Sequence, residues 1–317
     1  MTLTRRALIH LATAPLLAAT LLVAVPALAQ DDWRAAVPKV RVGVLGGENE
    51  ADRLARYENF RKLLETELGV PAELHAASDY AGVMQAWSAR QLEVAMLSPN
   101  AYAGIWLDTD GNIEPLVLTK ETDGSVGYRA MMYVRSDSPF QTLEDLKGKA
   151  LAYSDPNSAS GFLVPRNELR EMGKDPEKFF GRTGFAGGHE QAVVAVLQGQ
   201  YDAGVTWTSG VGDQSKGFSR GALQAMVEKG RLDMSQLRIV WTSRLIPNGP
   251  VGVRKDLPDA FKQKLKTLLM ELPTKHPDIY RETQRGAGAG FEPASHDIYE
   301  PLIAMRKDEA RARRERR

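Results

Sequence analysis

Short apolar segments alternate along the chain with longer amphipathic ones, and this alternation restricts the fold more than any other feature of the sequence. Segments typical of strands lie at 39–45, 72–76 and 94–97. Between them, residues 52–68 carry an apolar stripe at helical spacing, and Ser78 and Ser98 each precede a further helical segment. Strands and helices that alternate through short loops are typical of an α/β protein.

The length of the chain and its breaker residues predict two lobes. A chain of 317 residues is long for a single hydrophobic core. The alternation is interrupted near 121–127 and near 242–250, where we place two crossings of the chain between lobes. Lobe 1 is therefore predicted to comprise residues 30–122 together with 248–317, and lobe 2 to comprise residues 123–247.

The N-terminal segment has the features of a secretory signal peptide. Arg5 and Arg6 precede an apolar, uncharged run at 11–25, and Ala27-Leu28-Ala29 provides a small-x-small cleavage site. We expect cleavage after residue 29. A membrane anchor is the alternative, which Pro15 and the Ala-x-Ala ending disfavour. The adjacent arginines also leave the twin-arginine export route open beside the general one.

The charge balance and the absence of cysteine narrow the classes of function. The chain has 41 basic and 40 acidic residues, and removal of 1–29 takes away two basic ones, leaving 39 against 40 and a net charge of −1. Such a balance argues against a nucleic-acid partner. The basic cluster at 311–317 is predicted to be a frayed, solvated tail. With no cysteine, an exported chain has no disulfides, and export with this size indicates a bacterial periplasm.

A polar turn between a strand and a helix is the first candidate site. The apolar segment 150–153 predicts a strand, 154–157 a turn, and Ser158-Ala159-Ser160-Gly161 the start of an amphipathic helix. The first N–H groups of a helix have no intrahelical partner, and the helix dipole places partial positive charge there. Together with the hydroxyls, this end could bind an oxyanion. An ordinary N-cap is the alternative, because Ser, Asp and Asn are common caps.

Three other strand-to-helix junctions have the same design. They are Ser78-Asp79-Tyr80, the segment 98–102 that ends in Tyr102, and Gly187-Gly188-His189. Ligands of open α/β sheets bind at the carboxyl ends of strands, and cavities are frequent between domains. Two lobes that face each other would therefore bring these junctions to one cleft.

The order of motifs along the chain resembles a known family. Asp155-Pro-Asn-Ser-Ala-Ser-Gly161, Gly188-His-Glu190, Gly199-Gln-Tyr-Asp-Ala-Gly204 and Ile246-Pro-Asn-Gly-Pro250 are similar to segments of the phosphate/phosphite/phosphonate-binding proteins of bacterial ABC transporters. The resemblance covers residues 40 to about 272. It implies a two-lobed type II periplasmic binding-protein fold, with mixed sheets flanked by helices and a ligand cleft between the lobes. It also implies a small phosphorus oxyanion as ligand and a permease of the inner membrane as partner.

The resemblance assigns roles to six residues. Ser158 and Ser160 would donate their hydroxyls to the phosphorus oxyanion, beside the backbone N–H groups of Ala159 and Ser160. His189 would donate an imidazole N–H, and Tyr80 and Tyr102 would close the cavity from lobe 1. The family commonly has Thr where this chain has Ala159. One hydroxyl donor is therefore absent, a loss of roughly 0.5–1.5 kcal/mol if nothing replaces it.

The sequence also indicates what the ligand lacks. Members that hold aminoalkylphosphonates have acids after the Asp-Ala-Gly strand and within the Ile-Pro-Asn motif, where an ammonium group needs a partner. In this chain those positions read 206–208, Thr-Trp-Thr, and 248–250, Asn-Gly-Pro. We therefore expect a compact ligand without an amine, namely phosphite, phosphate or methylphosphonate.

Two other functions remain open at this point. Ser160, His189 and Asp202 are the residue types of a hydrolase triad, although the chain has no G-x-S-x-G motif. The same fold could also bind a different small anion. His75, His276 and His296 lack the spacing of metal ligands. No cofactor, no metal site and no catalytic residue is predicted.

Overall fold

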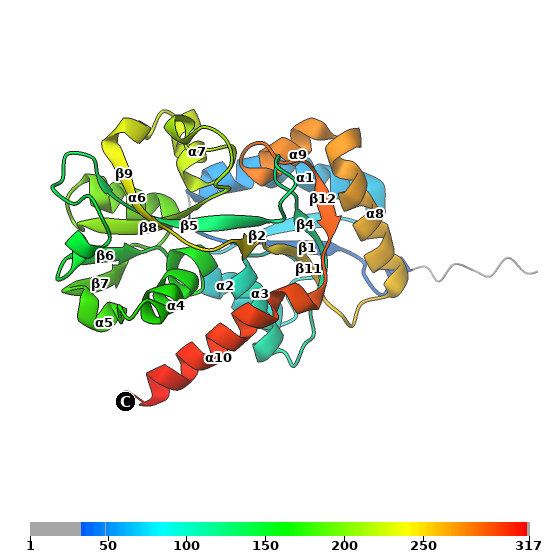
Figure 1. Cartoon of the computed structure of the whole chain (residues 1–317). Helices are drawn as coiled ribbons and strands as arrows, with labels where there is room; N and C mark the ends of the chain where they lie inside the picture. The colour runs from blue at the N-terminus through cyan, green and yellow to red at the C-terminus, as the bar shows by residue number, and fades with distance from the viewer. Residues whose placement is uncertain (1–32, 48, 316–317) are drawn as a thin grey trace, which may run out of the picture. The chain divides into compact units, whose positions relative to one another are not determined.

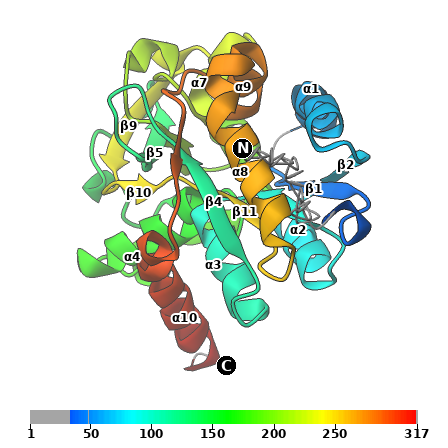
Figure 2. The ribbon, with the colours of Figure 1, turned by 90° about the vertical axis from the view of Figure 1, so that its right-hand side faces the viewer.

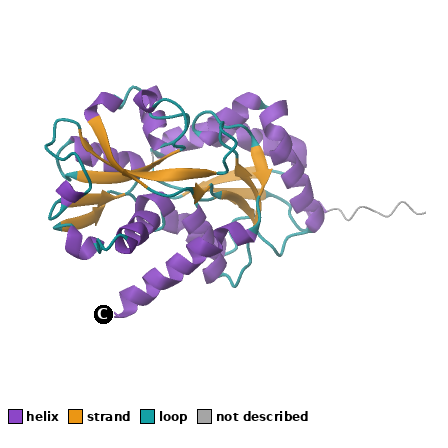
Figure 3. Ribbon diagram, in the orientation of Figure 1, coloured by secondary structure: helices purple, strands orange, loops and turns teal. Residues whose placement is uncertain are grey.

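The computed structural model describes residues 33–47 and 49–315. The predicted signal peptide at 1–29 lies outside the described residues. Helices flank two separate mixed sheets (Figure 3). None of the helices in the described part of the chain has the length and apolar character needed to span a bilayer.

The first sheet has the strand order β12-β4-β11-β3-β1-β2 (Figure 1). Its strands are β1 (Val40–Val44), β2 (Ala72–Ala76), β3 (Val94–Met96), β4 (Glu114–Thr119), β11 (Pro250–Val253) and β12 (Phe291–Pro293). β1 pairs in parallel with β2 and β3, whereas β11 is antiparallel to both β3 and β4. A late segment of the chain therefore completes the middle of this sheet.

The second sheet has the order β10-β5-β8-β6-β7, with β9 also paired to β5. Its strands are β5 (Gly127–Arg135), β6 (Ala150–Tyr153), β7 (Arg182–Phe185), β8 (Ala203–Thr208), β9 (Leu237–Thr242) and β10 (Ile246–Pro247). The chain thus passes from the first sheet to the second after Thr119 and returns after Pro247. The lobe boundaries at 122/123 and 247/248 stay a prediction.

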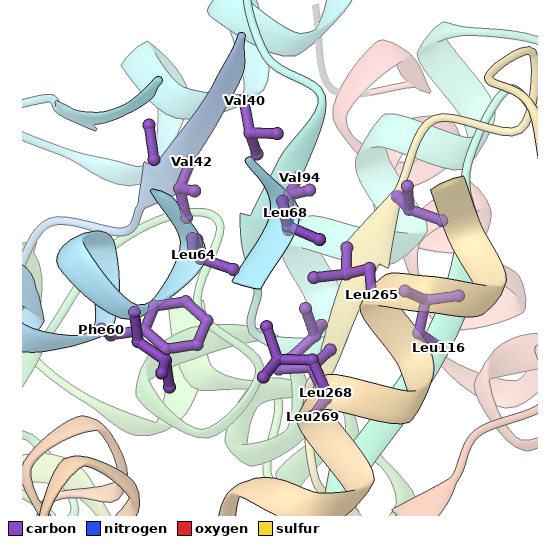
Figure 4. Close-up of a cluster of buried hydrophobic side chains, with 14 of the residues drawn as sticks. Val40, Val42, Phe60, Leu64, Leu68, Val94, Leu116, Leu265, Leu268 and Leu269 are labelled. Atoms are coloured by element: carbon purple, nitrogen blue, oxygen red, sulfur yellow. The ribbon is translucent and has the colours of Figure 1, made fainter. Parts of the chain in front are cut away.

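The longer helices cover the sheets because they bury apolar side chains against them. α1 (Glu50–Leu68) and α8 (Asp259–Lys275) pack against the first sheet and form its main core with β1 (Figure 4). The labelled side chains in this core are Val40, Val42, Phe60, Leu64, Leu68, Val94, Leu116, Leu265, Leu268 and Leu269. The remaining helices are α2 (Tyr80–Ser88), α3 (Pro99–Asp108), α4 (Val164–Glu171), α5 (Pro176–Phe179), α6 (His189–Leu197), α7 (Ala222–Glu228), α9 (Pro277–Gln284) and α10 (Glu300–Glu315).

Residues 311–315 are helical, where the sequence predicts a frayed tail, and 316–317 lie outside the described residues. α10 extends from the two sheets in both ribbon views and reaches Glu315 (Figures 1 and 2). Its Arg306 donates to Asn100 Oδ1 of α3 at 3.2 Å and to Asn157 Oδ1 at 3.0 Å. Glu309 accepts from Arg166 of α4 at 3.0 Å. These contacts join α10 to helices of both sheets, which is why this helix continues where solvent alone would let it fray.

Candidate ligand-binding site

A cavity of about 160 Å³ lies where strand ends and helix starts of both sheets meet. Four of the six residues predicted from the sequence line it, namely Tyr80, Ser158, Ser160 and His189. Each stands at or near the first position of a helix that follows a strand or a turn, so these side chains reach the same space. The wall also includes Gly46 after β1 and Ser98 after β3.

Tyr102 and Ala159 do not belong to the cavity lining. Tyr102 is fully buried in α3, where its hydroxyl forms a hydrogen bond of 2.9 Å with His296 Nδ1 and its ring lies 4.6 Å from that of Tyr299. Ala159 is fully buried between the two serines. Its side chain offers no polar atom, so any contribution to a ligand would come from its backbone N–H, in the first turn of the helix.

In the cavity wall, the imidazole of His189 is surrounded by hydroxyl groups. Its Nδ1 lies 3.0 Å from Ser154 Oγ and 3.2 Å from Thr206 Oγ1, and its Nε2 lies 3.2 Å from Ser158 Oγ. The ring is only 3% exposed. Burial, together with the positive charge of Arg285, lowers the pKa of His189 from 6.5 to about 3. The imidazole is therefore neutral at any pH near 7.

Packing around the turn explains why residue 161 is a glycine. A Cβ atom at this residue would lie 2.6 Å from Ser154 Cβ and 2.9 Å from Ser158 Oγ. The glycine therefore leaves room for the two serines that contact His189. Its own N–H donates to Ser158 Oγ at 2.9 Å, which caps the helix start.

The aromatic and acidic groups near the turn are largely desolvated. Burial raises the pKa of Tyr128, while a hydrogen bond with Ser160 lowers it in part, so the phenol stays protonated at neutral pH. Burial also raises the pKa of Asp155, against hydrogen bonds from the backbone of Asn157 and Tyr80. Asp155 does not line the cavity.

Two arginines in the cavity wall were not anticipated from the sequence. Arg220 is 6% exposed and forms a bidentate ion pair with the fully buried Glu121, and its Nη2 donates to Asn248 Oδ1 at 2.8 Å. Arg285 follows α9 in a left-handed conformation with φ 55°. Neither arginine belongs to a recognisable sequence motif. Tertiary packing alone brings each of them to the cavity. Thr283 and Gln284 line the cavity beside Arg285.

The two segments in which aminoalkylphosphonate-binding members have acids, 206–208 and 248–250 in this chain, also lie at the cavity. Trp207 and Asn248 both line it, and Thr206 contacts His189. Among the described lining residues there are two arginines and no Asp or Glu. The described wall therefore holds two guanidinium groups, and that of Arg220 is paired with the buried Glu121.

The residues of the alternative hydrolase triad are not arranged as one. The Asp202 carboxylate accepts from the backbone N–H of Ala150 at 2.8 Å, and the groups at His189 Nδ1 are the hydroxyls of Ser154 and Thr206. In the part of the chain that the structure describes, no group of three His, Asp or Glu side chains could hold a metal ion.

Comparison with known proteins places this chain in a family. The profile of the family described as "ABC transporter, phosphonate, periplasmic substrate-binding protein" matches residues 42–299. The phosphate-import protein PhnD of Mycolicibacterium smegmatis is 30% identical over 243 residues, which are 73% of this chain and 71% of that protein. The phosphonates-binding periplasmic protein of Escherichia coli is 30% identical over 286 residues, 89% of this chain and 78% of that protein.

A solved structure agrees with the same assignment. The crystal structure of a binding protein component of an ABC phosphonate transporter from Pseudomonas aeruginosa superposes with a TM-score of 0.71 at 25% sequence identity, covering 85% of each chain. The predicted type II periplasmic binding-protein fold is therefore confirmed. The chain belongs to the family of periplasmic substrate-binding proteins of phosphonate ABC transporters.

Proposed function

We propose that this protein captures a small phosphorus oxyanion in the cavity of about 160 Å³ and delivers it to the permease of an ABC importer. The observation that carries the proposal is the composition of the cavity wall. It combines a helix start bearing Ser158 and Ser160 with a neutral His189, two arginines and no acid among the described lining residues. Such a wall favours a compact anion over an ammonium-bearing ligand.

Binding needs no covalent chemistry. The first N–H groups of the helix at Ala159–Leu163, the Ser160 hydroxyl and the nearby arginines together offset the charge of the oxyanion. Tyr80 and Tyr128 add phenol hydroxyls from the two sides of the cavity. Closure of the two lobes over the ligand would follow from the ligand's greater affinity for the closed form. The closed form would then be what the permease recognises.

The relatives named above limit the choice of ligand without deciding it. One is named for phosphate import and the other for phosphonates. The absence of an acid among the described lining residues favours phosphite, phosphate or methylphosphonate over aminoethylphosphonate. A different small anion in the same fold is the second candidate.

The cellular location follows from the family together with the sequence. Members are periplasmic binding proteins, and residues 1–29 have the pattern of a cleaved signal peptide. We infer that the mature protein works in the periplasm beside its permease. The site geometry also supports binding rather than hydrolysis, because a histidine whose pKa is about 3 and whose Nδ1 faces hydroxyls is a poor general base.

The test is thermal unfolding of the exported protein with phosphite, phosphate, methylphosphonate, aminoethylphosphonate and sulfate. A ligand at a hundred times its Kd adds about 2.7 kcal/mol of stability. We expect a shift with one phosphorus oxyanion and none with sulfate. Ser160→Ala should reduce the shift, and Ser215→Ala, in an exposed loop helix, is the matched control. No shift with any phosphorus oxyanion, or turnover of a chromogenic phosphate ester, would contradict the proposal.

A further inference from the structure

Ser154 is a buried hydroxyl that the proposed function does not use. It is 0% exposed, does not line the cavity, and lies at the end of β6 directly behind His189. Its Oγ contacts two groups. One is the carbonyl oxygen of Val205 at 2.8 Å, and the other is His189 Nδ1 at 3.0 Å. The direction of these two hydrogen bonds decides what the other side of the imidazole presents to the ligand.

The hydroxyl proton of Ser154 is donated to the backbone carbonyl of Val205. A carbonyl oxygen can only accept, so the single hydroxyl proton of Ser154 is donated to Val205. Ser154 Oγ can then only accept from His189, which places the ring proton on Nδ1. Since the imidazole is neutral, Nε2 carries a lone pair. The alternative tautomer would leave two acceptors facing each other at 3.0 Å.

The tautomer sets the direction of the next hydrogen bond. Nε2 lies 3.2 Å from Ser158 Oγ, so Ser158 must donate its proton to the ring. Ser158 Oγ already accepts from Gly161 N–H at 2.9 Å. What Ser158 can still offer to the cavity is a lone pair. This reverses the donor roles that the family resemblance implies for Ser158 and His189.

We propose that Ser154 acts as a positioning residue that makes Ser158 a hydrogen-bond acceptor, so that the receptor binds the singly protonated form of its phosphorus oxyanion. The P–OH of the ligand donates to Ser158, and its unprotonated oxygens accept from Ser160, the helix N–H groups and the arginines. Phosphate, phosphite and phosphonates can supply such a proton near pH 7. Sulfate and sulfonates cannot, and would place an oxygen lone pair against that of Ser158. The inference rests on the proposed function and adds the protonation state of the substrate.

The other charged and titratable groups around this network come from several elements. They are Asp155 in the same turn, Glu190 in α6 with its partners Lys229 and Arg231, Tyr80 in α2, Tyr128 in β5, Arg220 before α7 and Arg285 after α9. The pKa of His189 is lowered to about 3 and that of Tyr128 is raised, so neither changes charge near pH 7.

Proton-linked calorimetry tests the inference. Methylphosphonate is titrated into the protein from pH 6 to 9, in two buffers that differ in ionisation enthalpy. We expect uptake of up to one proton per bound ligand above the ligand's own second pKa, and affinity that falls about tenfold per pH unit there. Methanesulfonate, which has the same shape without the proton, should bind roughly 10- to 100-fold more weakly at pH 7.

Ser154→Ala separates positioning from simple structural support. Without the Ser154 acceptor, Thr206 can donate to Nδ1, the ring proton moves to Nε2, and Ser158 becomes free to donate to the ligand. The pH dependence should flatten and methanesulfonate should gain relative to methylphosphonate. Thr206→Val is the matched control and should keep the proton uptake, because Ser154 remains. A purely structural role would weaken binding equally at every pH.

A direct readout covers the case in which Ser154→Ala does not fold. The ¹⁵N chemical shifts of the His189 ring in the ligand-free wild type, assigned by comparison with His189→Asn, should show protonated Nδ1 and unprotonated Nε2. Binding without proton uptake, an unchanged pH slope in a folded Ser154→Ala variant, or a protonated Nε2 would each overturn the inference alone. A wild type that binds no phosphorus oxyanion would overturn the proposed function and the inference together.

Discussion

Glu121→Gln should destabilise the protein strongly, because it removes one partner of a fully buried ion pair. Glu121 lies where the chain leaves the first sheet, and its carboxylate accepts from Arg220 Nε at 3.2 Å and from Asn248 Nδ2 at 2.9 Å. The side chains of Arg220 and Glu121 are 7% and 0% exposed. Glutamine keeps the shape of glutamate but leaves the guanidinium charge without a buried counter-charge.

The expected loss is about 3 kcal/mol of unfolding free energy. Breaking a buried pair from one side costs about 3–5 kcal/mol. One amide oxygen remains as an acceptor and recovers about 1 kcal/mol. Urea unfolding followed by tryptophan fluorescence measures this directly, because the Arg220 guanidinium lies 5.0 Å from the ring of Trp207. Adding Arg220→Met should restore more than half of the loss, since no unpaired charge then remains.

An exposed pair serves as the control for this reasoning. Glu58 forms an ion pair with Arg61 on the outer face of α1, where the Glu58 side chain is 41% exposed. Glu58→Gln should leave the urea midpoint almost unchanged, because solvent screens such pairs. A Glu121→Gln variant within about 1 kcal/mol of the wild type, or a double variant no more stable than the single one, would refute the account of the buried pair.

Three further predictions concern the site. Ser160→Ala should weaken methylphosphonate binding by about 1–3 kcal/mol in calorimetry, and the loss of its hydrogen bond with Tyr128 should lower the unliganded melting temperature by a few degrees; equal affinity would contradict its role as a donor. Gly161→Ala should cost about 1–3 kcal/mol in urea unfolding, because its Cβ would lie 2.7 Å from Ser154 Oγ, and it should also weaken binding. Because the pKa of His189 falls from 6.5 to about 3 on folding, the unfolded chain binds a proton that the folded protein does not between those values. Stability should therefore be fully present above pH 6.5 and decrease as the pH falls, by roughly 3 kcal/mol at pH 4, and His189→Asn should remove most of that slope.

Much of the fold was predictable because alternating apolar and amphipathic segments carry it. The segments 72–76 and 150–153 coincide with β2 and β6, and the expected helix 52–68 lies within α1. Site residues at helix starts were predictable for a related reason, since strand ends gather at one edge of a sheet. Tyr80 lines the cavity, whereas Tyr102, with the same kind of position, faces His296. Tyr102 is kept from the cavity because the segment with His296 and Tyr299 packs on its face of α3. No local sequence pattern indicates that contact.

The arginines illustrate the other limit of the sequence. Arg285 belongs to the segment after Leu272, to which the sequence assigns no role, yet Thr283, Gln284 and Arg285 form part of the cavity wall. Likewise, the pairing of Arg220 with Glu121 joins residues 99 positions apart. Contacts of this range follow from packing of the completed fold and leave no trace in local spacing or periodicity.

The place of β11 in the first sheet has a consequence for biogenesis. β11 is the strand that connects β3 to β4, and it begins only at Pro250, after the whole second sheet has been made. Until that segment is available, β3 and β4 have no shared partner and the core beneath them lacks α8. Such long-range pairing forms slowly, because the chain loses the entropy of closing a long loop before the strand contacts stabilise it. A chain that crosses a membrane unfolded would thus keep its first sheet incomplete until the segment from Pro250 onward has crossed. A chaperone that shields apolar strands would then act longest on the N-terminal half.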